Sequence, residues 1–246
     1  MKLLLLVIFL VYVVLIVSIG LAIAFKSLGL IIFFSIVFFI VLVFFTFYLS
    51  LYLDNVIFEK KLKKLELNAK LTNLINAYKL SVLFNYVKTK LSTTLASFMI
   101  MKKDFAYAQK VLSLVDVTKI KDKTNLLNYF LCHIELAMAK KDTKNFENNV
   151  SRLKSIIETN PEVISLLDNY NVVLNLLEGI EVDELKLQNS ADYFYNVYLK
   201  EDSNLNKLFY LFVKSYTKGF TSEDSEEYIN LSKDTFLEHT SLLTQY

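Results

Sequence analysis

The sequence predicts an all-α protein with two parts: a two-helix transmembrane hairpin at the N-terminus and an array of helical hairpins after it. Three observations lead to this prediction. The first 53 residues carry almost no charge. In the rest of the chain, apolar side chains recur in steps of three and four, which is the period of an amphipathic helix. Beyond residue 53 there are only two glycines, Gly179 and Gly219, and no segment alternates as a strand does.

Residues 1–53 contain two uncharged runs, 3–25 and 28–53, with Lys26 between them. A helix rises about 1.5 Å per residue and the hydrocarbon core of a bilayer is about 30 Å thick, so about 20 apolar residues cross it. Neither run has the polar face that a core helix of a soluble protein would show. We therefore expect two transmembrane helices, at about 3–25 and 28–53.

Lysines follow the second run at once, and they predict its orientation. The four residues are Lys60, Lys61, Lys63 and Lys64. Positive charge close to the end of a span favours the cytoplasmic side of a membrane. We therefore expect a multi-pass protein of the inner or plasma membrane with its main domain in the cytoplasm. The same four lysines are expected to contact anionic lipid head groups, which attract each of them by about 1 kcal/mol.

The first hydrophobic run has an alternative interpretation as a cleaved signal peptide. The stretch Ala22-Ile23-Ala24 has the small residues of a signal-peptidase site and follows a Lys-led apolar stretch. That stretch is longer than the apolar region of a usual signal peptide. Cleavage would leave the expected side of the main domain unchanged, because the second span still precedes the lysines.

After the expected spans, the chain divides into two further regions. We expect a basic juxtamembrane helix at 54–80 and a helical domain at 81–246. Breaks in the apolar period, at charged pairs, at Asn160-Pro161 and at the two glycines, separate the expected helices of the third region. A capping box is expected at Thr221 and Asp224. The expected helices are 81–102, 105–115, 124–140, 143–158, 162–178, 183–199, 204–217 and 222–243.

Charge is distributed unevenly along the soluble part. Residues 54–123 contain 14 Lys and six acidic residues, whereas residues 124–246 contain 11 basic and 19 acidic residues. The net positive charge of the first half and the net negative charge of the second half cancel. All but one of the basic residues of the chain are Lys. This balance does not favour nucleic-acid binding, which needs a net basic surface.

Residues 91–115 resemble one tetratricopeptide repeat, a helix–turn–helix unit of about 34 residues. Ala96 matches the small residue of the first helix, Asp104-Phe105 the turn, and Ala108 the small residue of the second helix. Small side chains at these places let the two helices approach closely. The resemblance implies a curved stack of hairpins whose first helices line a partner-binding surface.

The resemblance weakens further along the chain. A second match surrounds Lys141-Asp142, but Phe146 stands where the family has Ala. A last hairpin, 204–217 with 222–238, resembles the repeat only in its turn, Lys218-Gly219-Phe220. Two N-terminal spans followed by such repeats are also similar in layout to the HemY family, although no motif carries that family's assignment to haem biosynthesis over to this chain.

Catalytic and metal-binding chemistry finds no support in the sequence. Cys132 is the only cysteine, and His133 and His239 are the only histidines. Cys132 and His133 are adjacent, so on a helix their side chains point about 100° apart. No zinc, phosphate-loop or EF-hand motif occurs. We therefore expect no enzyme activity, no cofactor and no bound metal, unless catalytic residues assemble from scattered positions.

The favoured functional hypothesis is a membrane-anchored scaffold or adaptor that binds a protein partner. If the repeat alignment holds, its partner-binding surface is lined by Lys90, Ser97, Asn128 and Glu135, which would pair charges or hydrogen bonds with the partner. Two alternatives stay open. The chain could be an assembly subunit whose spans pack against another membrane protein, or a membrane-acting toxin, immunity or lysis component.

Overall fold

The structure is a computed structural model that describes residues 16–20, 23, 28–66, 71–81, 85–157 and 160–238. All regular secondary structure in these ranges is helical, which confirms the all-α prediction. The chain divides into two compact units, Met1–Tyr52 and Leu53–Tyr246.

The first unit contains most of helix α2 (Leu28–Lys63). Within α2, the stretch Ile32–Lys63 is long and apolar enough to cross a membrane, and its most apolar 18-residue window has a mean hydropathy of 2.8. Side chains such as Phe39 are largely exposed, as a lipid-facing helix requires. No other helix of the described ranges meets this test. The other expected span, 3–25, lies outside the described residues except for 16–20 and 23.

Within 54–80, expected as one juxtamembrane helix, the structure describes residues 54–66 and 71–80. Helix α2 continues to Lys63, and a turn follows in which Leu65 adopts a left-handed φ of 55°. Helix α3 (Thr72–Leu80) comes next and buries Leu74 and Ala77.

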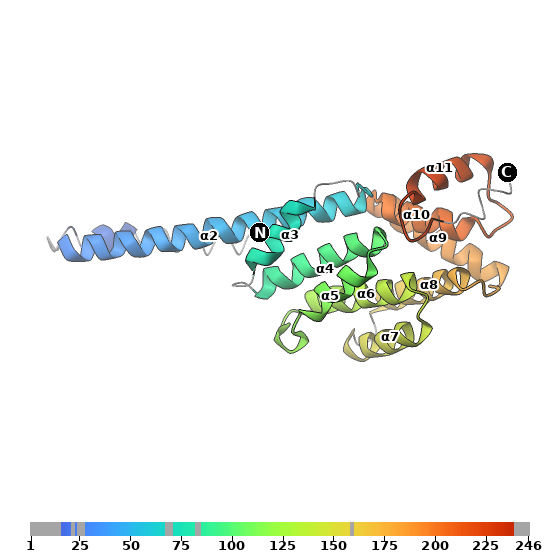
Figure 1. Cartoon of the computed structure of the whole chain (residues 1–246), viewed down its shortest axis with the longest axis horizontal. Coiled ribbons are helices and arrows are strands. Elements are labelled where there is room, and N and C mark those ends of the chain that lie inside the picture. The colour runs from blue at the N-terminus through green and yellow to red at the C-terminus, as the bar shows by residue number, and fades with distance from the viewer. Residues whose placement is uncertain are drawn as a thin grey trace. The chain divides into compact units, whose positions relative to one another are not determined.

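The second unit contains the hairpins (Figure 1). Helix α4 packs against α5 and α6, α6 packs against α7 and α8, and α9 packs most extensively against α10. The bounds agree with the expected helices to within a few residues, except that the last helix ends at Ser232 instead of 243. The helices are α4 (Asn85–Met101), α5 (Phe105–Ser113), α6 (Lys123–Ala139), α7 (Thr143–Ile157), α8 (Pro161–Leu177), α9 (Glu184–Glu201), α10 (Asn204–Lys214) and α11 (Ser222–Ser232), with a short 3-10 turn, η2 (Val117–Lys119), before α6.

Helices α4, α6 and α8 end in the same way at a constant spacing. Lys103, Lys141 and Gly179 follow each other at steps of 38 residues and have φ values of 64°, 56° and 75°. In each case the N–H of this residue donates to the carbonyl three residues back, and the next N–H donates to the carbonyl five residues back. This is the Schellman ending, in which a left-handed residue satisfies the last carbonyls of a helix.

The core of the second unit is rich in aromatic side chains. Tyr170 of α8, Phe194 of α9 and Phe209 of α10 form a stack, with Phe194 and Phe209 centroids 5.2 Å apart and an interplanar angle of 18°. Burying such a ring contributes about 1.5–3 kcal/mol. The stack therefore holds α8 against the α9–α10 pair.

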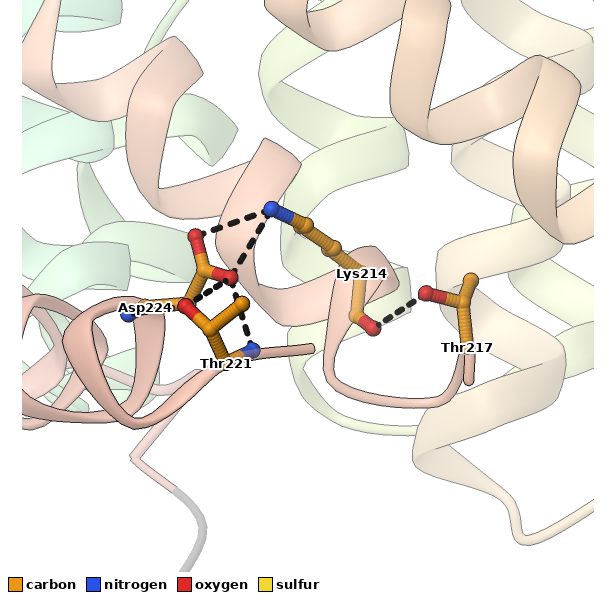
Figure 2. A network of polar contacts seen from close by, with 4 residues as sticks. All are labelled: Lys214, Thr217, Thr221 and Asp224. Atoms are coloured by element: carbon orange, nitrogen blue, oxygen red, sulfur yellow. Dashed lines mark hydrogen bonds and ion pairs between the residues drawn. The ribbon is translucent and has the colours of Figure 1, made fainter. Parts of the chain in front are cut away.

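The last described helix, α11, is fixed to α10 by polar contacts (Figure 2). Lys214 Nζ lies 2.8 Å from Asp224 Oδ2. Thr221 and Asp224 form the capping box that the sequence predicts. Burial raises the pKa of Asp224, but hydrogen bonds from Lys214 and Thr221 outweigh it and hold that pKa below the ordinary value. Thr217 Oγ1 also donates to the Lys214 carbonyl, at 2.8 Å, and closes the turn between the two helices.

Candidate partner-binding surface

Two of the four predicted surface residues, Ser97 and Glu135, contribute to one polar cluster in the structure. The other two lie on the same two helices, α4 and α6. Lys90 is half-buried on α4, with its ammonium 5.3 Å from the centre of the Tyr86 ring one turn earlier. Asn128 is half-buried on α6. Each lies about two turns before its predicted neighbour, Ser97 on α4 or Glu135 on α6, and their role in one surface stays a prediction.

The polar cluster links α4, α6 and α8. Ser97 Oγ of α4 lies 3.3 Å from Cys132 Sγ of α6, and the Cys132 thiol also approaches the Thr93 carbonyl at 3.5 Å. One turn further along α6, Glu135 Oε1 accepts a hydrogen bond of 3.0 Å from the Tyr170 hydroxyl of α8. Sequence reasoning did not single out Tyr170, because its partner Glu135 lies 35 residues earlier and no local pattern links the two.

Protonation in this cluster is shifted by burial. Burial raises the pKa of Glu135 to about 7, although hydrogen bonds from Tyr170 and Ser97 act in the opposite direction. Burial also raises the pKa of the Cys132 thiol well above its ordinary value. A thiol that stays protonated is a poor nucleophile. We therefore interpret the cluster as a polar contact that joins α4, α6 and α8.

His133 faces a different side of α6. Its ring lies 4.6 Å from the Tyr129 ring, and burial, together with the nearby Arg152, lowers its pKa. Its Nε2 is buried with no hydrogen-bond partner in the described part of the chain. Among the described residues, no three His, Cys, Asp or Glu side chains converge to hold a metal ion. His239 lies outside those residues.

The end of α2 is attached to α4 by a buried polar contact. Asn55 is 1% exposed, and its Oδ1 accepts a hydrogen bond of 2.8 Å from Thr94 Oγ1. Its Nδ2 donates to Glu59 Oε1 at 2.7 Å, so both ends of the amide are satisfied. One turn on, the rings of Phe58 and Phe98 meet edge to face at 5.9 Å. The C-terminal part of α2 thus belongs to the second unit, which contains the hairpins and is called the hairpin domain below.

The same end of α2 also contacts the turn between α9 and α10. Lys63 Nζ forms an ion pair with Glu201 at 2.9 Å. The Ser203 hydroxyl donates to the Lys63 carbonyl at 3.3 Å, and the Asn204 amide donates to the Lys64 carbonyl at 3.2 Å. These partners lie about 140 residues away in sequence, so no local pattern indicates them.

The lysines predicted to contact lipid therefore differ in their surroundings. Lys60, Lys63 and Lys64 are exposed, and Lys63 has the ion pair described above. Lys61 is half-buried, with its ammonium 5.3 Å from the centre of the Phe58 ring. Their contact with lipid stays a prediction.

In comparisons with known proteins, no protein-family profile, no curated protein and no solved structure matches the chain.

Proposed function

We propose that this chain is a membrane-anchored helical-repeat scaffold that binds a protein partner at the cytoplasmic face of the membrane. One observation carries the proposal. Helix α2 contains the stretch Ile32–Lys63, which is long and apolar enough to cross a membrane, and the C-terminal part of the same helix, with Asn55 and Phe58, is buried among the hairpins of the second unit. An anchor joined in this way ties the domain to the membrane surface.

The helix endings support a repeat architecture. The Schellman endings of α4, α6 and α8 recur every 38 residues, and an Asp caps the helix that follows each of them. We therefore interpret the hairpins as units similar to tetratricopeptide repeats, with a longer period than the usual 34 residues or so. Such stacks present extended surfaces that bind peptides or helices. A second span at 3–25 would complete the anchor.

A second candidate function is an assembly subunit that acts through its span. It is favoured by the large apolar side chains that α2 leaves exposed, among them Ile36, Phe39 and Phe44. In a membrane such side chains can pack against lipid or against helices of another protein. The two functions differ in which part of the chain touches the partner.

Photocrosslinking in the native membrane separates the two functions. The crosslinking residue p-benzoylphenylalanine replaces exposed residues of the domain, Tyr86, Asn171 or Tyr195, or the span residue Phe39. The scaffold predicts crosslinks to one partner protein from domain positions, and only lipid adducts from Phe39. Protein crosslinks from Phe39 alone would support the assembly subunit and contradict the scaffold.

The cytoplasmic orientation has its own test. Lys218 lies exposed in the turn before α11, and the native Cys132 is buried with a protonated thiol. A Lys218→Cys variant therefore offers one reactive thiol. A membrane-impermeant maleimide should label it only after the cells are permeabilised. Labelling of intact cells would place the domain outside.

A further inference from the structure

Helices α8 and α9, with the connection between them, line an open polar pocket of about 400 Å³. This volume is in the range of about 300–1,000 Å³ that is typical of ligand sites. Asp168, Asn171 and Asn175 lie in steps of three and four, so they share one face of α8, and the start of α9 supplies Lys186 and Ser190. The pocket therefore opens between a polar stripe of one helix and the first turns of the next.

The pocket coincides with an insertion in the hairpin. In the α4–α5 and α6–α7 hairpins, the left-handed residue that ends the first helix is followed at once by the Asp that caps the second. In the α8–α9 hairpin, Gly179 is left-handed but the cap is Asp183, because Ile180, Glu181 and Val182 are inserted. Glu181 and Val182 both line the pocket. The longer connection gives α8 and α9 room to separate.

Ser190 gives independent evidence for a ligand. Its side chain is 0% exposed, it lines the pocket, and its hydroxyl has no hydrogen-bond partner within the described ranges. A helical serine can donate to a carbonyl one turn back, as Ser92 donates to the Lys88 carbonyl at 2.7 Å. A buried hydroxyl without a partner is unfavourable. A ligand in the pocket can satisfy it.

The charge of the lining is acidic. Asp168, Glu181 and Asp183 stand against the single base Lys186. Lys154 Nζ approaches Asp168 Oδ1 only to 3.8 Å, and both side chains are largely exposed, so this ion pair is weak. Asp183 Oδ1 accepts the first N–H groups of α9 as a cap. The rim therefore favours a cationic group.

Asparagine carboxamides complete the lining. Four of them, including Asn171, Asn175 and Asn189, line the pocket together with the carboxylates. A carboxamide has both a donor and an acceptor and so matches a peptide group. Asn169 Nδ2 already donates to the Ser165 carbonyl at 2.7 Å, which leaves its oxygen as the acceptor.

We propose that this pocket binds an extended peptide segment of the partner protein through a lysine or arginine side chain. The cationic head group pairs with Asp168 and Glu181, the asparagines bond the adjacent peptide groups, and Ser190 supplies the innermost hydroxyl. The inference rests on the proposed scaffold function and names the chemistry that its partner must present.

The test uses the full-length protein in detergent micelles. Its probes are fluorescent ten-residue peptides of Ser, Gly and Asn with one central Lys, Arg, Glu or Met. Binding is measured by fluorescence anisotropy at low salt. The Lys and Arg peptides should bind at least tenfold more tightly than the Glu and Met peptides. Spermidine and free lysine test whether the cationic group alone is enough, and both should compete only weakly.

Variants locate the binding. Asp168→Asn combined with Glu181→Gln should weaken binding of the Lys peptide about tenfold, whereas Asp192→Asn, an exposed carboxylate of α9 outside the pocket, should not. Asn171→Phe should block the pocket, and Asn148→Phe on exposed α7 surface is its control. Ser190→Ala should weaken binding while leaving the melting temperature of the free protein unchanged or higher, because no existing hydrogen bond is lost.

Three results would overturn the proposal: equal binding of all four peptides, binding that ignores the pocket variants, or displacement of the Lys peptide by spermidine at equal concentration. None of these would by itself contradict the scaffold function, since photocrosslinks from other hairpin positions would still show a partner. Loss of all protein crosslinks from the domain would remove the scaffold function itself.

Discussion

Glu135 makes the stability of the hairpin domain depend on pH. Its pKa is about 7 in the folded protein, against an ordinary value of 4.5. The folded state therefore binds the proton more tightly than the unfolded state, and the free energy of unfolding must fall as pH rises through this interval. Each pKa unit corresponds to about 1.4 kcal/mol, so the total loss between pH 4.5 and 7 is about 3 kcal/mol. This is an upper value, because the side chain is only half-buried.

The substitution Glu135→Gln removes this pH dependence. Glutamine has nearly the same shape, and its oxygen can still accept the hydrogen bond from Tyr170. The variant should match the wild-type protein near pH 4 and be more stable at pH 8 by up to about 3 kcal/mol. For a domain of this size that difference raises the melting temperature by about 6–12 °C.

The assay is thermal unfolding of the full-length protein in detergent, followed by circular dichroism at 222 nm from pH 4 to pH 8.5. Glu147→Gln, which changes an exposed carboxylate of α7, is the matched control and should follow the wild-type curve. A constant offset between Glu135→Gln and wild type at every pH would refute the reasoning, since it would show that Glu135 does not titrate differently in the folded state.

The remaining predictions concern single contacts. Thr94→Val leaves Asn55 Oδ1 buried without a donor and should lower the free energy of unfolding by about 1–3 kcal/mol in urea titrations. Lys141→Gly relieves a left-handed φ of 56° and should raise the melting temperature, with a gain of about 0.5–1 kcal/mol. Asp224→Asn removes the ion pair with Lys214. Because the pKa of Asp224 is lowered in the folded state, its stabilisation exists above the ordinary carboxyl pKa and is lost as pH falls through the lowered value, so the variant should lose stability at pH 7 but not at pH 2.

Each of these predictions has a contradicting result. Unchanged urea unfolding of Thr94→Val would mean that the end of α2 does not pack against α4. A lower melting temperature for Lys141→Gly would show that its side chain makes a stabilising contact. Equal stability of Asp224→Asn and wild type at pH 7 would show that the ion pair between Asp224 and Lys214 in Figure 2 contributes nothing net.

Part of the candidate sites could be predicted from the sequence. The capping box at Thr221 and Asp224 is a local pattern, and it forms as predicted. Ser97 and Glu135 were chosen from a repeat alignment, and they do contribute to one cluster, but Cys132 and Tyr170 complete it and turn the side chains toward neighbouring helices. The polar pocket was not predicted, because its acidic and amide residues look like ordinary solvated positions until α8 and α9 are placed together.

The sequence alone determined that the chain is helical, where most helices begin and end, and that one long apolar stretch can cross a membrane. These features depend on local spacing, capping residues and hydrophobicity, all of which can be read within a window of about 20 residues. Only the tertiary structure decided that Asn55 is buried against Thr94 and that the α8–α9 connection opens a pocket. Those outcomes depend on contacts between residues far apart in the chain, and no local pattern encodes which distant side chain will meet a given one.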